Sequence, residues 1–274
     1  MLYLCATPIG NLEDITLRAL RILKESDLIL AEDTRVTRKI LARYEIHVPL
    51  ETYNENNHSE KISEILDRLS RDESIVCVSD AGTPAISDPG FELVKATLDH
   101  GFKISPLPGA SAGISALICS GLDSRRFTFI GFLPRTKKKR ADLLSEIHSR
   151  QETLIFYEAP HRLKETLEDL FFHFGNRRIV LARELTKIHE EFLRGRISEL
   201  LEQIEDPRGE FVIIVEGFDP SIEVIEKLVL DPLNQYKNFL KSGLDKKSAI
   251  RETAKICNMS RREIYQMIVK EDNQ

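Results

Sequence analysis

The sequence predicts an α/β protein made of two α/β/α domains, followed by a small all-α tail. Apolar runs of strand length alternate with helical patterns up to about residue 218, and from residue 221 onward only helical patterns occur. Such alternation is typical of a parallel sheet with helices on its faces. The length of 274 residues also exceeds that of one ordinary domain. We therefore expect domains over residues 1–121 and 122–218, and a helical tail over 219–274.

The first domain is expected to contain a mostly parallel sheet. Its predicted strands cover residues 3–7, 27–31, 48–52, 75–78 and 103–107, and helical patterns separate them. The run 75–78 is β-branched without alternation, as in a strand that is buried on both faces. Asp14 is expected to cap the first helix. Asp88 and Pro89 are expected at the N-cap and N1 positions of the helix after residue 90.

The second domain is expected to carry a mixed sheet. Its predicted strands cover residues 126–132, 153–157, 178–182, 189–193 and 211–215. Because only a few residues separate the third and fourth of these strands, they are expected to be antiparallel neighbours. In the tail, Asp245 is expected to cap one helix, and Ser260 and Glu263 to form the capping box of a second. Asn258 is expected in the left-handed turn between the two helices.

Composition excludes several classes of protein. The apolar fraction of 42% and the charged fraction of 30% are those of a soluble globular protein. No apolar run is long enough to cross a bilayer, and the first residues do not have the pattern of a signal peptide. Cys5, Cys77, Cys119 and Cys257 are far apart in the sequence, which favours buried thiols in a reducing compartment and no metal site. A cytoplasmic protein is therefore expected.

Several common catalytic motifs are absent from the sequence. It contains no G-x-G-x-x-G after a strand, no G-x-x-x-x-G-K-[ST], no H-E-x-x-H and no G-x-S-x-G. These absences argue against dinucleotide binding, P-loop phosphoryl transfer, zinc proteolysis and α/β-hydrolase chemistry.

Polar or small residues follow the predicted strands of both domains. The loops cover residues 7–11, 32–35 and 80–84 in the first domain, and 157–162, 183–187 and 209–210 in the second. In open α/β sheets, ligands bind beyond the carboxyl ends of the strands. Asp80 is a carboxylate among residues small enough to let a ligand approach the backbone. We therefore expect an enzyme site between the two domains.

The ordered series of these loops resembles the tetrapyrrole methylase superfamily and, within it, the ribosomal RNA small subunit methyltransferase I family. The matching segments are TPIGNLED (7–14), AEDTR (31–35), SDAGTP (79–84), PGASA (108–112), GFLPR (131–135), YEAPHR (157–162) and ARE (182–184). The resemblance covers roughly residues 1–218. Superfamily relatives often carry Gly-Asp-Pro where this chain has Ser79-Asp80-Ala81, so the acid is kept while its neighbours differ.

The resemblance implies S-adenosylmethionine as cofactor, bound between the domains of a homodimer. It also implies 2′-O-methylation of a cytidine ribose, cytidine 1402 in RNA numbering, so the expected partner is 16S ribosomal RNA or the small ribosomal subunit. The residues that match cofactor-binding positions of the family are Pro8, Asp80, Ala81, Gly82, Ser111, Ala112, Tyr157 and Ala182.

Methylation of a ribose hydroxyl requires a group that accepts its proton. Glu32, Asp33 and Glu184 are candidates for that role. Basic residues near the same strand ends could hold RNA phosphates or lower the pKa of the hydroxyl, and these are Arg35, Arg183 and Lys187. Structural ion pairs at the strand ends are an equally good interpretation of all six residues.

Two basic segments are candidates for RNA binding, because electrostatic attraction to phosphates is local. Residues 125–140 contain seven basic residues and no acidic one. The candidate RNA-binding residues are Arg135, Lys137, Lys138, Lys139 and Arg140, together with Lys246, Lys247, Arg261 and Arg262 on the helix-turn-helix-like tail. The alternatives are a solvated face for the first segment and a small packing bundle for the tail.

Two other functions are compatible with the sequence. The same fold could methylate a tetrapyrrole or another small molecule, but the basic segments favour RNA. A ligand-sensing regulator with a DNA-binding helix-turn-helix would also suit the tail. That function predicts binding of specific duplex sequences without turnover, and it leaves the charged strand ends without a role.

Overall fold

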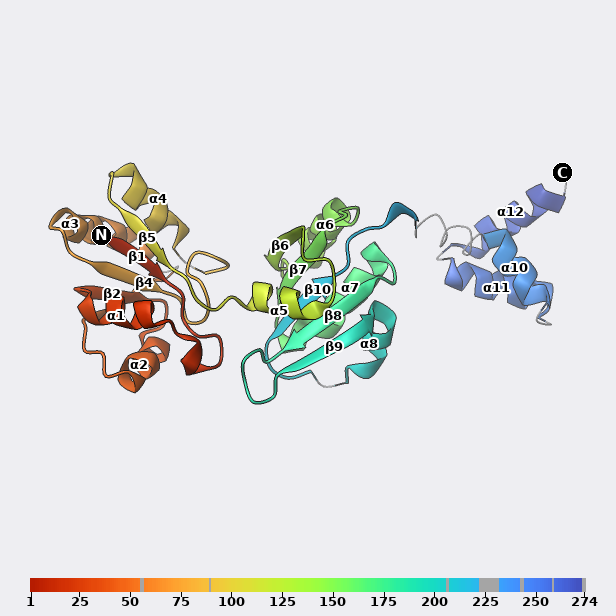
Figure 1. Cartoon of the computed structure of the whole chain (residues 1–274). Coiled ribbons are helices and arrows are strands. Elements are labelled where there is room, and N and C mark those ends of the chain that lie inside the picture. The colour runs from red at the N-terminus through yellow and green to blue at the C-terminus, as the bar shows by residue number, and fades with distance from the viewer. Residues whose placement is uncertain are drawn as a thin grey trace. The chain divides into compact units, whose positions relative to one another are not determined.

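The structure is a computed structural model that describes residues 1–54, 57–88, 90–205, 207–221, 232–241, 244–257 and 259–272. The chain divides into two compact units, Met1–Gly217 and Phe218–Gln274. The first unit contains two sheets, each with its own helices (Figure 1). In the part of the chain that the structure describes, no helix is both long enough and apolar enough to span a bilayer.

The first sheet is entirely parallel, as predicted. In spatial order its strands are β3 (Leu50–Thr52), β2 (Leu28–Ala31), β4 (Ile75–Val78), β1 (Leu2–Cys5) and β5 (Ile104–Leu107). Every residue of β2 and β4 is buried, because helices cover both faces of the sheet. The carboxyl ends of these strands therefore meet at one edge, where ligands bind in such sheets.

Two pairs of helices enclose the first sheet. Helices α1 (Leu17–Glu25) and α2 (Thr34–Arg43) bury apolar side chains against one face, and α3 (His58–Ser70) and α4 (Phe91–Asp99) cover the other face. A short 3₁₀ turn, η1 (Leu12–Asp14), precedes α1.

Two of the predicted helix caps are wrong. Asp14 lies within η1, and the residue that caps α1 is Thr16, whose side chain accepts a hydrogen bond from the backbone of Ala19. The N-cap of α4 is Gly90, not Asp88. Pro89 lies outside the described residues. Asp88 therefore does not cap a helix, and its carboxylate is available for another role.

The second sheet is mixed, as predicted. Its strands are β6 (Phe127–Phe132), β7 (Thr153–Glu158), β10 (Phe211–Val215), β8 (Arg178–Arg183) and β9 (Glu191–Arg196), in that spatial order. Only β6 and β7 are parallel, and every other neighbouring pair is antiparallel, including β8 and β9. The sheet therefore ends in β6 on one side and β9 on the other, and both edge strands leave backbone groups exposed.

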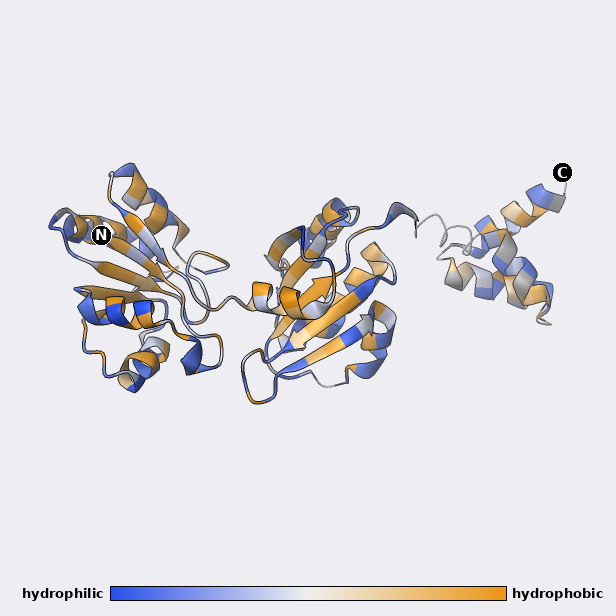
Figure 2. Cartoon of the chain, in the orientation of Figure 1, coloured by the Kyte–Doolittle hydropathy of each residue, from blue (hydrophilic) through white to orange (hydrophobic). Residues whose placement is uncertain are grey.

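The two faces of the second sheet are covered differently. Helices α6 (Lys137–Ile147), α7 (Pro160–Phe174) and α8 (Ile197–Gln203) pack on one face. The other face is covered by α5 (Ala112–Ser120), which the predicted boundary at residue 121 had assigned to the first domain. Figure 2 shows central strands of both sheets, and helix α5, as strongly hydrophobic segments of the first unit. Because α5 starts beside the end of β5 and packs on the second sheet, it ties the two sheets together.

The second unit is a small helical bundle. It contains α10 (Pro232–Lys241), α11 (Lys246–Ile256) and α12 (Arg261–Asp272), around a core that includes Tyr236, Ala249 and Ile264. Asp245 caps α11 by accepting the backbone N–H of Ser248, and Ser260 and Glu263 form the predicted capping box at α12. Asn258 lies outside the described residues.

Candidate functional site

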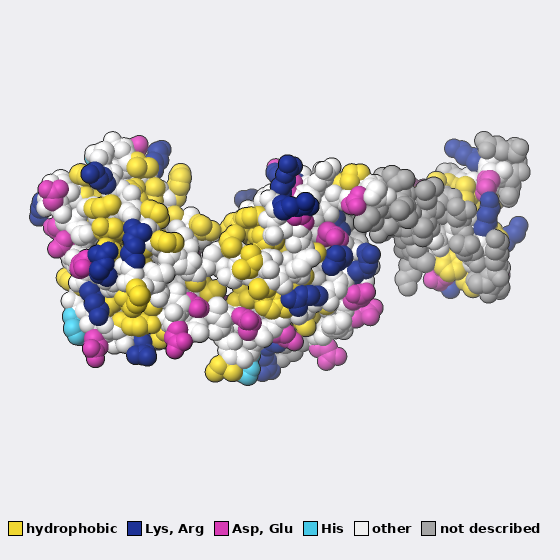
Figure 3. All heavy atoms as spheres, viewed as in Figure 1, with side chains coloured by type: hydrophobic (Ala, Val, Ile, Leu, Met, Phe, Trp, Pro, Cys, Tyr) yellow, Lys and Arg dark blue, Asp and Glu magenta, His cyan; other side chains and the backbone are white. Residues whose placement is uncertain are grey.

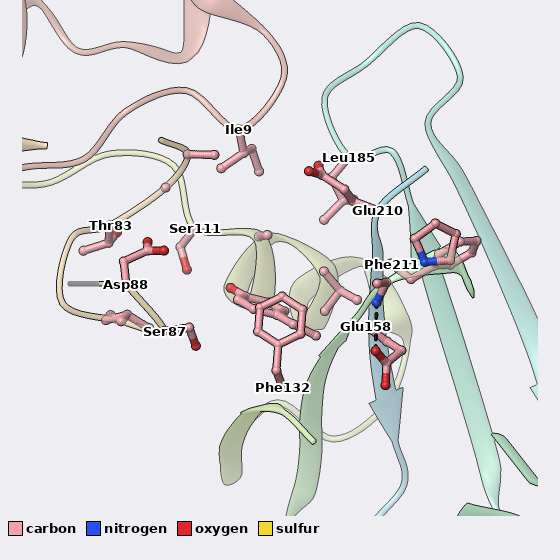
Figure 4. Close-up of a pocket in the computed structure, with 18 residues that line it drawn as sticks. Ile9, Thr83, Ser87, Asp88, Ser111, Phe132, Glu158, Leu185, Glu210 and Phe211 are labelled. Atoms are coloured by element: carbon pink, nitrogen blue, oxygen red, sulfur yellow. Dashed lines mark hydrogen bonds between the residues drawn. The ribbon is translucent and has the colours of Figure 1, made fainter. Parts of the chain in front are cut away.

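A pocket of about 380 Å³ lies within the first unit, and residues of both sheets and of α5 line it (Figure 4). The loop after β1 and the loop after β4 supply Ile9, Ala81, Gly82, Thr83, Ile86, Ser87 and Asp88; the start of α5 supplies Ser111 and Ala112; the second sheet and its loops supply Phe132, Tyr157, Glu158, Ala159, Pro160, Leu185, Glu210, Phe211 and Val212. We call this cavity the donor pocket. Its size and mainly apolar lining with a few polar groups are typical of a small-molecule site.

The loop after β4 is held in place by the loop after β1. Thr7 and Gly82 exchange two backbone hydrogen bonds of 2.8 and 3.1 Å, and the hydroxyl of Thr7 donates to the carbonyl of Ser79. Further along, Ala85 and Ser87 have φ values of 67° and 62°. Non-glycine residues in the left-handed region are strained, and such strain tends to persist at ligand-binding sites. The loop therefore has a defined shape around the pocket.

Asp88 places a carboxyl group in the donor pocket. Figure 4 shows it with Ser87 on one side of the cavity, while Phe132, Glu158 and Glu210 lie on the other. Burial raises the pKa of Asp88 to about 6, and the negative charge of Asp80 adds to this effect, although a hydrogen bond from Ser79 opposes it. The sequence had suggested a helix cap here. An acidic residue following a small-residue loop is the signal that could have found it.

The predicted cofactor-binding residues divide into two groups. Ala81, Gly82, Ser111, Ala112 and Tyr157 line the donor pocket. The hydroxyl of Tyr157 accepts a hydrogen bond of 3.1 Å from the backbone N–H of Gly113, which fixes the ring against α5.

Pro8, Asp80 and Ala182 form the second group. Among the described residues that line the pocket, none of these three occurs. Asp80 points to the end of β2 instead, where its Oδ1 accepts a 2.9 Å hydrogen bond from the backbone N–H of Asp33. Asp80 therefore joins two loops of the first sheet, and Asp88 is the carboxylate that the loop after β4 places in the pocket.

The predicted catalytic residues after β2 lie outside the pocket lining. Glu32 and Asp33 are half-buried, and Asp33 caps α2. The guanidinium of Arg35 lies 2.5 Å from Asp33 Oδ2, and its hydrogen bonds lower the pKa of Asp33 to about 2. A carboxylate with so low a pKa is a weak general base. The pairing of Asp33 with Arg35 matches the structural ion pair that the sequence left open.

Glu184 and Lys187, two of the residues predicted at the end of β8, belong to a cluster at the rim of the pocket. Lys187 Nζ lies 2.9 Å from Glu184 Oε1 and 3.1 Å from Glu210 Oε2. Glu184 Oε1 also accepts the backbone N–H of Glu210 at 3.0 Å. Glu210 itself lines the pocket. We call Glu184, Lys187 and Glu210 the rim cluster; Glu210 was not among the predicted catalytic residues.

Hydrogen bonds within the rim cluster favour the charged forms of Glu184 and Lys187. The backbone hydrogen bond from Glu210 and then the contact with Lys187 lower the pKa of Glu184. Burial lowers the pKa of Lys187, but hydrogen bonds to Glu184 and Glu210 outweigh it and hold that pKa above its usual value. The cluster therefore offers a permanent cation to whatever binds beside it.

Two glycines let the backbone come close to the side chains of the rim cluster. A Cβ on Gly10 would lie 2.6 Å from Lys187 Cγ, and a Cβ on Gly209 would lie 2.5 Å from Glu184 Cγ. Gly209 also has a φ of 85°, which favours glycine. Arg183 is directed away from the cluster, since it donates to the carbonyl of Arg208 and contacts Glu191.

The structure separates the predicted RNA-binding residues of the first unit. Arg135, Lys137, Lys138 and Lys139 are exposed, and Figure 3 shows Lys and Arg side chains spread over the surface of this unit. Arg140 does not fit the prediction, because only 1% of its side chain is exposed. It lies 2.5 Å from both Glu165 and Asp169 of α7, so it joins two helices. In the second unit, Lys246, Lys247, Arg261 and Arg262 are all exposed.

Comparison with known proteins identifies the family. Residues 1–201 match the model of the tetrapyrrole (corrin/porphyrin) methylases. The chain is 46% identical to the ribosomal RNA small subunit methyltransferase I of Halalkalibacterium halodurans, over 98% of this chain and 95% of that protein. The chain belongs to the ribosomal RNA small subunit methyltransferase I family of tetrapyrrole methylases. The corresponding protein of Bacillus subtilis is also 46% identical, over 97% of this chain and 92% of its own length.

A solved structure supports the fold of this methyltransferase family member. Uroporphyrin-III C-methyltransferase from Thermus thermophilus, complexed with S-adenyl homocysteine, matches with a TM-score of 0.54 and 21% identity over 78% of this chain and 96% of that chain. The resemblance inferred from the loop motifs is thus confirmed, as is the fold class of two α/β domains with a parallel and a mixed sheet.

Proposed function

We propose that this protein transfers a methyl group from S-adenosylmethionine to the 2′-hydroxyl of a cytidine ribose in 16S ribosomal RNA, at cytidine 1402 in RNA numbering. The observation that carries the proposal is the near full-length identity of 46% to ribosomal RNA small subunit methyltransferases I, in a chain that has a pocket between its two sheets. The exact nucleotide and ribose position come from the family resemblance of the loop motifs.

The donor pocket fits S-adenosylmethionine chemically. Ala81, Gly82 and Ala112 have small or absent side chains, so a ligand can approach the main chain closely. Phe132, with 55% of its surface exposed, offers an apolar ring that suits a flat base. When bound, the cofactor supplies the methyl group on a cationic sulfonium. We assign Asp88 as the carboxylate that balances the positive charge of this ligand, in place of Asp80, the acid predicted to bind the cofactor.

The rim cluster fits the acceptor side of the reaction. A ribose hydroxyl becomes a better nucleophile when its proton is accepted and the developing negative charge is stabilised. In this proposal the cation of Lys187 stabilises that charge. Glu210, whose side chain is 79% exposed, accepts the proton, and Glu184 holds Lys187 in position. Because the transfer is an in-line displacement, holding donor and acceptor in one geometry contributes much of the rate.

RNA contacts are assigned to the exposed basic residues of both units. Arg135, Lys137, Lys138 and Lys139 stand at the start of α6, and the second unit contributes Lys246, Lys247, Arg261 and Arg262. Neutralisation of phosphates by such residues supplies sequence-independent affinity, which suits a substrate recognised within a large RNA.

A homodimer is the proposed assembly. Ile118 on α5 is 71% exposed, and Phe127 and Phe129 on the edge strand β6 are 41% and 36% exposed. Exposed apolar side chains grouped on neighbouring elements are typical of protein interfaces. A second copy of the chain is the partner that the family resemblance implies.

The test of the proposed function is methyl transfer from labelled S-adenosylmethionine to small ribosomal subunits that lack the modification, with ribose methylation mapped along the RNA. We expect label on one decoding-centre ribose with the wild-type protein, and a strong loss of label with Asp88→Asn. Absence of transfer to any ribosomal substrate, in a protein that binds the cofactor, would reject RNA methylation and favour a small-molecule acceptor.

A further inference from the structure

A second cavity lies in the first unit, at the opposite end of the second sheet from the donor pocket. Its volume is about 350 Å³, and its lining includes Arg178 at the start of β8 and Arg194 and Arg196 at the end of β9. The residue Ser120, at the end of α5, closes one side. We call this site the arginine cavity. None of the predicted catalytic, cofactor-binding or RNA-binding residues lines it.

The strand register brings the three arginines onto one face of the sheet. Arg178 and Arg196 are direct cross-strand partners in the antiparallel pair of β8 and β9, the two neighbouring strands in Figure 1. Arg194 is two residues from Arg196 and therefore points to the same face. Like charges directly opposite each other across two strands are destabilising. The arrangement is therefore unfavourable unless an anion compensates it.

The protein groups around the cavity compensate these charges only in part. The guanidinium of Arg194 donates to the carbonyl of Cys119 at 2.7 Å, and that of Arg196 donates to the carbonyl of Asn176 at 2.7 Å. Both acceptors are neutral. Within the described part of the chain, neither of these two guanidinium groups has a carboxylate oxygen within 4 Å, and the guanidinium of Arg178 has only that of Glu216, at 3.7 Å.

One carboxylate, that of Glu199, lines the cavity, and it already accepts a hydrogen bond. Its Oε2 receives the backbone N–H of Arg196 at 2.8 Å, as part of the capping of α8. Each guanidinium has five N–H donors, and the main-chain contacts use only some of them. All three arginine side chains are exposed, so the remaining donors can reach a ligand. Guanidinium groups bind phosphate oxygens in paired hydrogen bonds.

The position of the cavity indicates the kind of ligand. β8 begins at Arg178 in the arginine cavity and ends at Arg183, next to the rim cluster. Five steps of about 3.3 Å separate these ends, or roughly 17 Å. A small acceptor molecule in the donor pocket cannot span that distance, whereas an RNA strand can. We infer that the arginine cavity binds the phosphate backbone of the RNA substrate beside the methylated nucleotide, an inference that rests on the proposed function.

The variant Arg178→Gln/Arg196→Gln tests this inference in the full-length protein. The matched control, Arg21→Gln/Arg71→Gln, removes two exposed arginines from the first domain and changes the net charge equally. The probes are a 16S RNA fragment that contains the decoding centre, measured over a range of salt concentrations, and S-adenosylmethionine.

If the inference is correct, the cavity variant binds the RNA about tenfold more weakly or worse. The slope of log K against log salt concentration becomes shallower by about 1.4, as for the loss of two phosphate contacts on a single strand. Affinity for S-adenosylmethionine stays at the wild-type value, and the melting temperature of the free protein does not fall, because a like-charge pair has been removed. RNA binding equal to that of the control variant overturns the inference. Failure of the wild-type protein to bind or methylate RNA would instead reject the proposed function.

A second measurement avoids substitutions. Cys119 is exposed and its carbonyl accepts the hydrogen bond from Arg194, so an RNA strand bound in the cavity would pass beside this residue. The RNA fragment at saturating concentration is expected to slow alkylation of Cys119, followed by mass spectrometry, while S-adenosylmethionine alone leaves the rate unchanged. Unchanged alkylation in the saturated RNA complex overturns the inference.

Discussion

At the scale of single residues, the carboxyl group of Asp88 makes the charge of the donor pocket depend on pH. Burial raises its pKa to about 6, so the group is protonated below that pH and negatively charged above it. Only the charged form attracts a cationic ligand. Binding of a cation also stabilises the charged form, so it lowers the pKa of Asp88 and releases a proton near pH 6.

We predict that affinity for S-adenosylmethionine rises with pH through about 6 in the wild-type protein and is flat over the same range in Asp88→Asn. At pH 7.5 the variant is expected to bind about tenfold more weakly, because a charge-assisted contact is lost. Calorimetry in buffers of different ionisation enthalpy measures both affinity and proton release. Asp99→Asn, an exposed acid at the end of α4, is the control. A pH-independent wild-type affinity would contradict the role of Asp88.

The positive charge of Lys187 is expected to contribute to the rate of methyl transfer. Lys187→Gln is expected to lower kcat by about a hundredfold, as for removal of one group that stabilises transition-state charge, without changing the Kd for S-adenosylmethionine. Lys187→Arg, which keeps the charge, should recover part of the activity. Single-turnover methylation measures the rate, and Lys164→Gln, an exposed lysine of α7, serves as control. An unchanged kcat would show that Lys187 does not stabilise the charge that develops on the ribose oxygen.

At the scale of elements, α6 illustrates how a run of basic residues divides between surface and interior. The first turn exposes its lysines, while Arg140, at the next position in the sequence, faces α7 and pairs with Glu165 and Asp169. The helical period explains the difference, because successive residues of a helix point about 100° apart. Basic residues that are adjacent in the sequence therefore need not all lie on the protein surface.

This division predicts opposite effects for two neighbouring substitutions. Arg140→Met should lower the free energy of unfolding by about 2 kcal/mol, because it removes the charge-assisted hydrogen bonds of a buried guanidinium, and should leave RNA affinity unchanged. Lys138→Gln should weaken RNA binding and leave stability unchanged. Urea denaturation and RNA titration of both variants measure these effects. Loss of RNA affinity in a stably folded Arg140→Met protein would restore the original prediction for Arg140.

At the scale of the whole molecule, the chain combines a catalytic unit with a helical unit that exposes basic residues at the starts of two helices. Each has its own apolar core. Lys246 and Lys247 begin α11, and Arg261 and Arg262 begin α12. These four residues are exposed, while the opposite sides of both helices pack in the core of the bundle. Substitution of these four residues should therefore change the affinity of the second unit for phosphates without unfolding it.

We predict that replacing these four basic residues of the tail by Gln weakens RNA binding and makes it less dependent on salt, while cofactor affinity stays at the wild-type value. Fluorescence titrations with the RNA fragment and with S-adenosylmethionine measure the two affinities. Wild-type RNA affinity in this variant would indicate that the tail forms a packed helical bundle and does not bind RNA.

The proposed homodimer gives a further prediction at this scale. Ile118→Glu places a charge on the exposed apolar side of α5 and should convert the dimer to a monomer, as measured by light scattering after gel filtration. Leu17, on α1, is 86% exposed and offers the control Leu17→Glu. A wild-type protein that is already a monomer would contradict the proposed assembly.

Several features of the molecule followed from local patterns in the sequence. The buried run 75–78, the short link between β8 and β9 and the capping box at Ser260 and Glu263 each specify structure through nearby residues, and each was predicted correctly. The ordered loop motifs identified the family in the same way, because they occur at strand ends whose positions the α/β alternation determines.

Other features depended on contacts between distant residues. Two carboxylates lie eight positions apart after β4, yet only tertiary packing directs Asp80 to the end of β2 and Asp88 into the donor pocket. Strand register likewise brings Arg178 and Arg196 together from separate segments. The sequence by itself determined the elements, the family and the loops that form the site. Only the tertiary structure decided which charged groups meet, because burial and pairing depend on neighbours that are far apart in the chain.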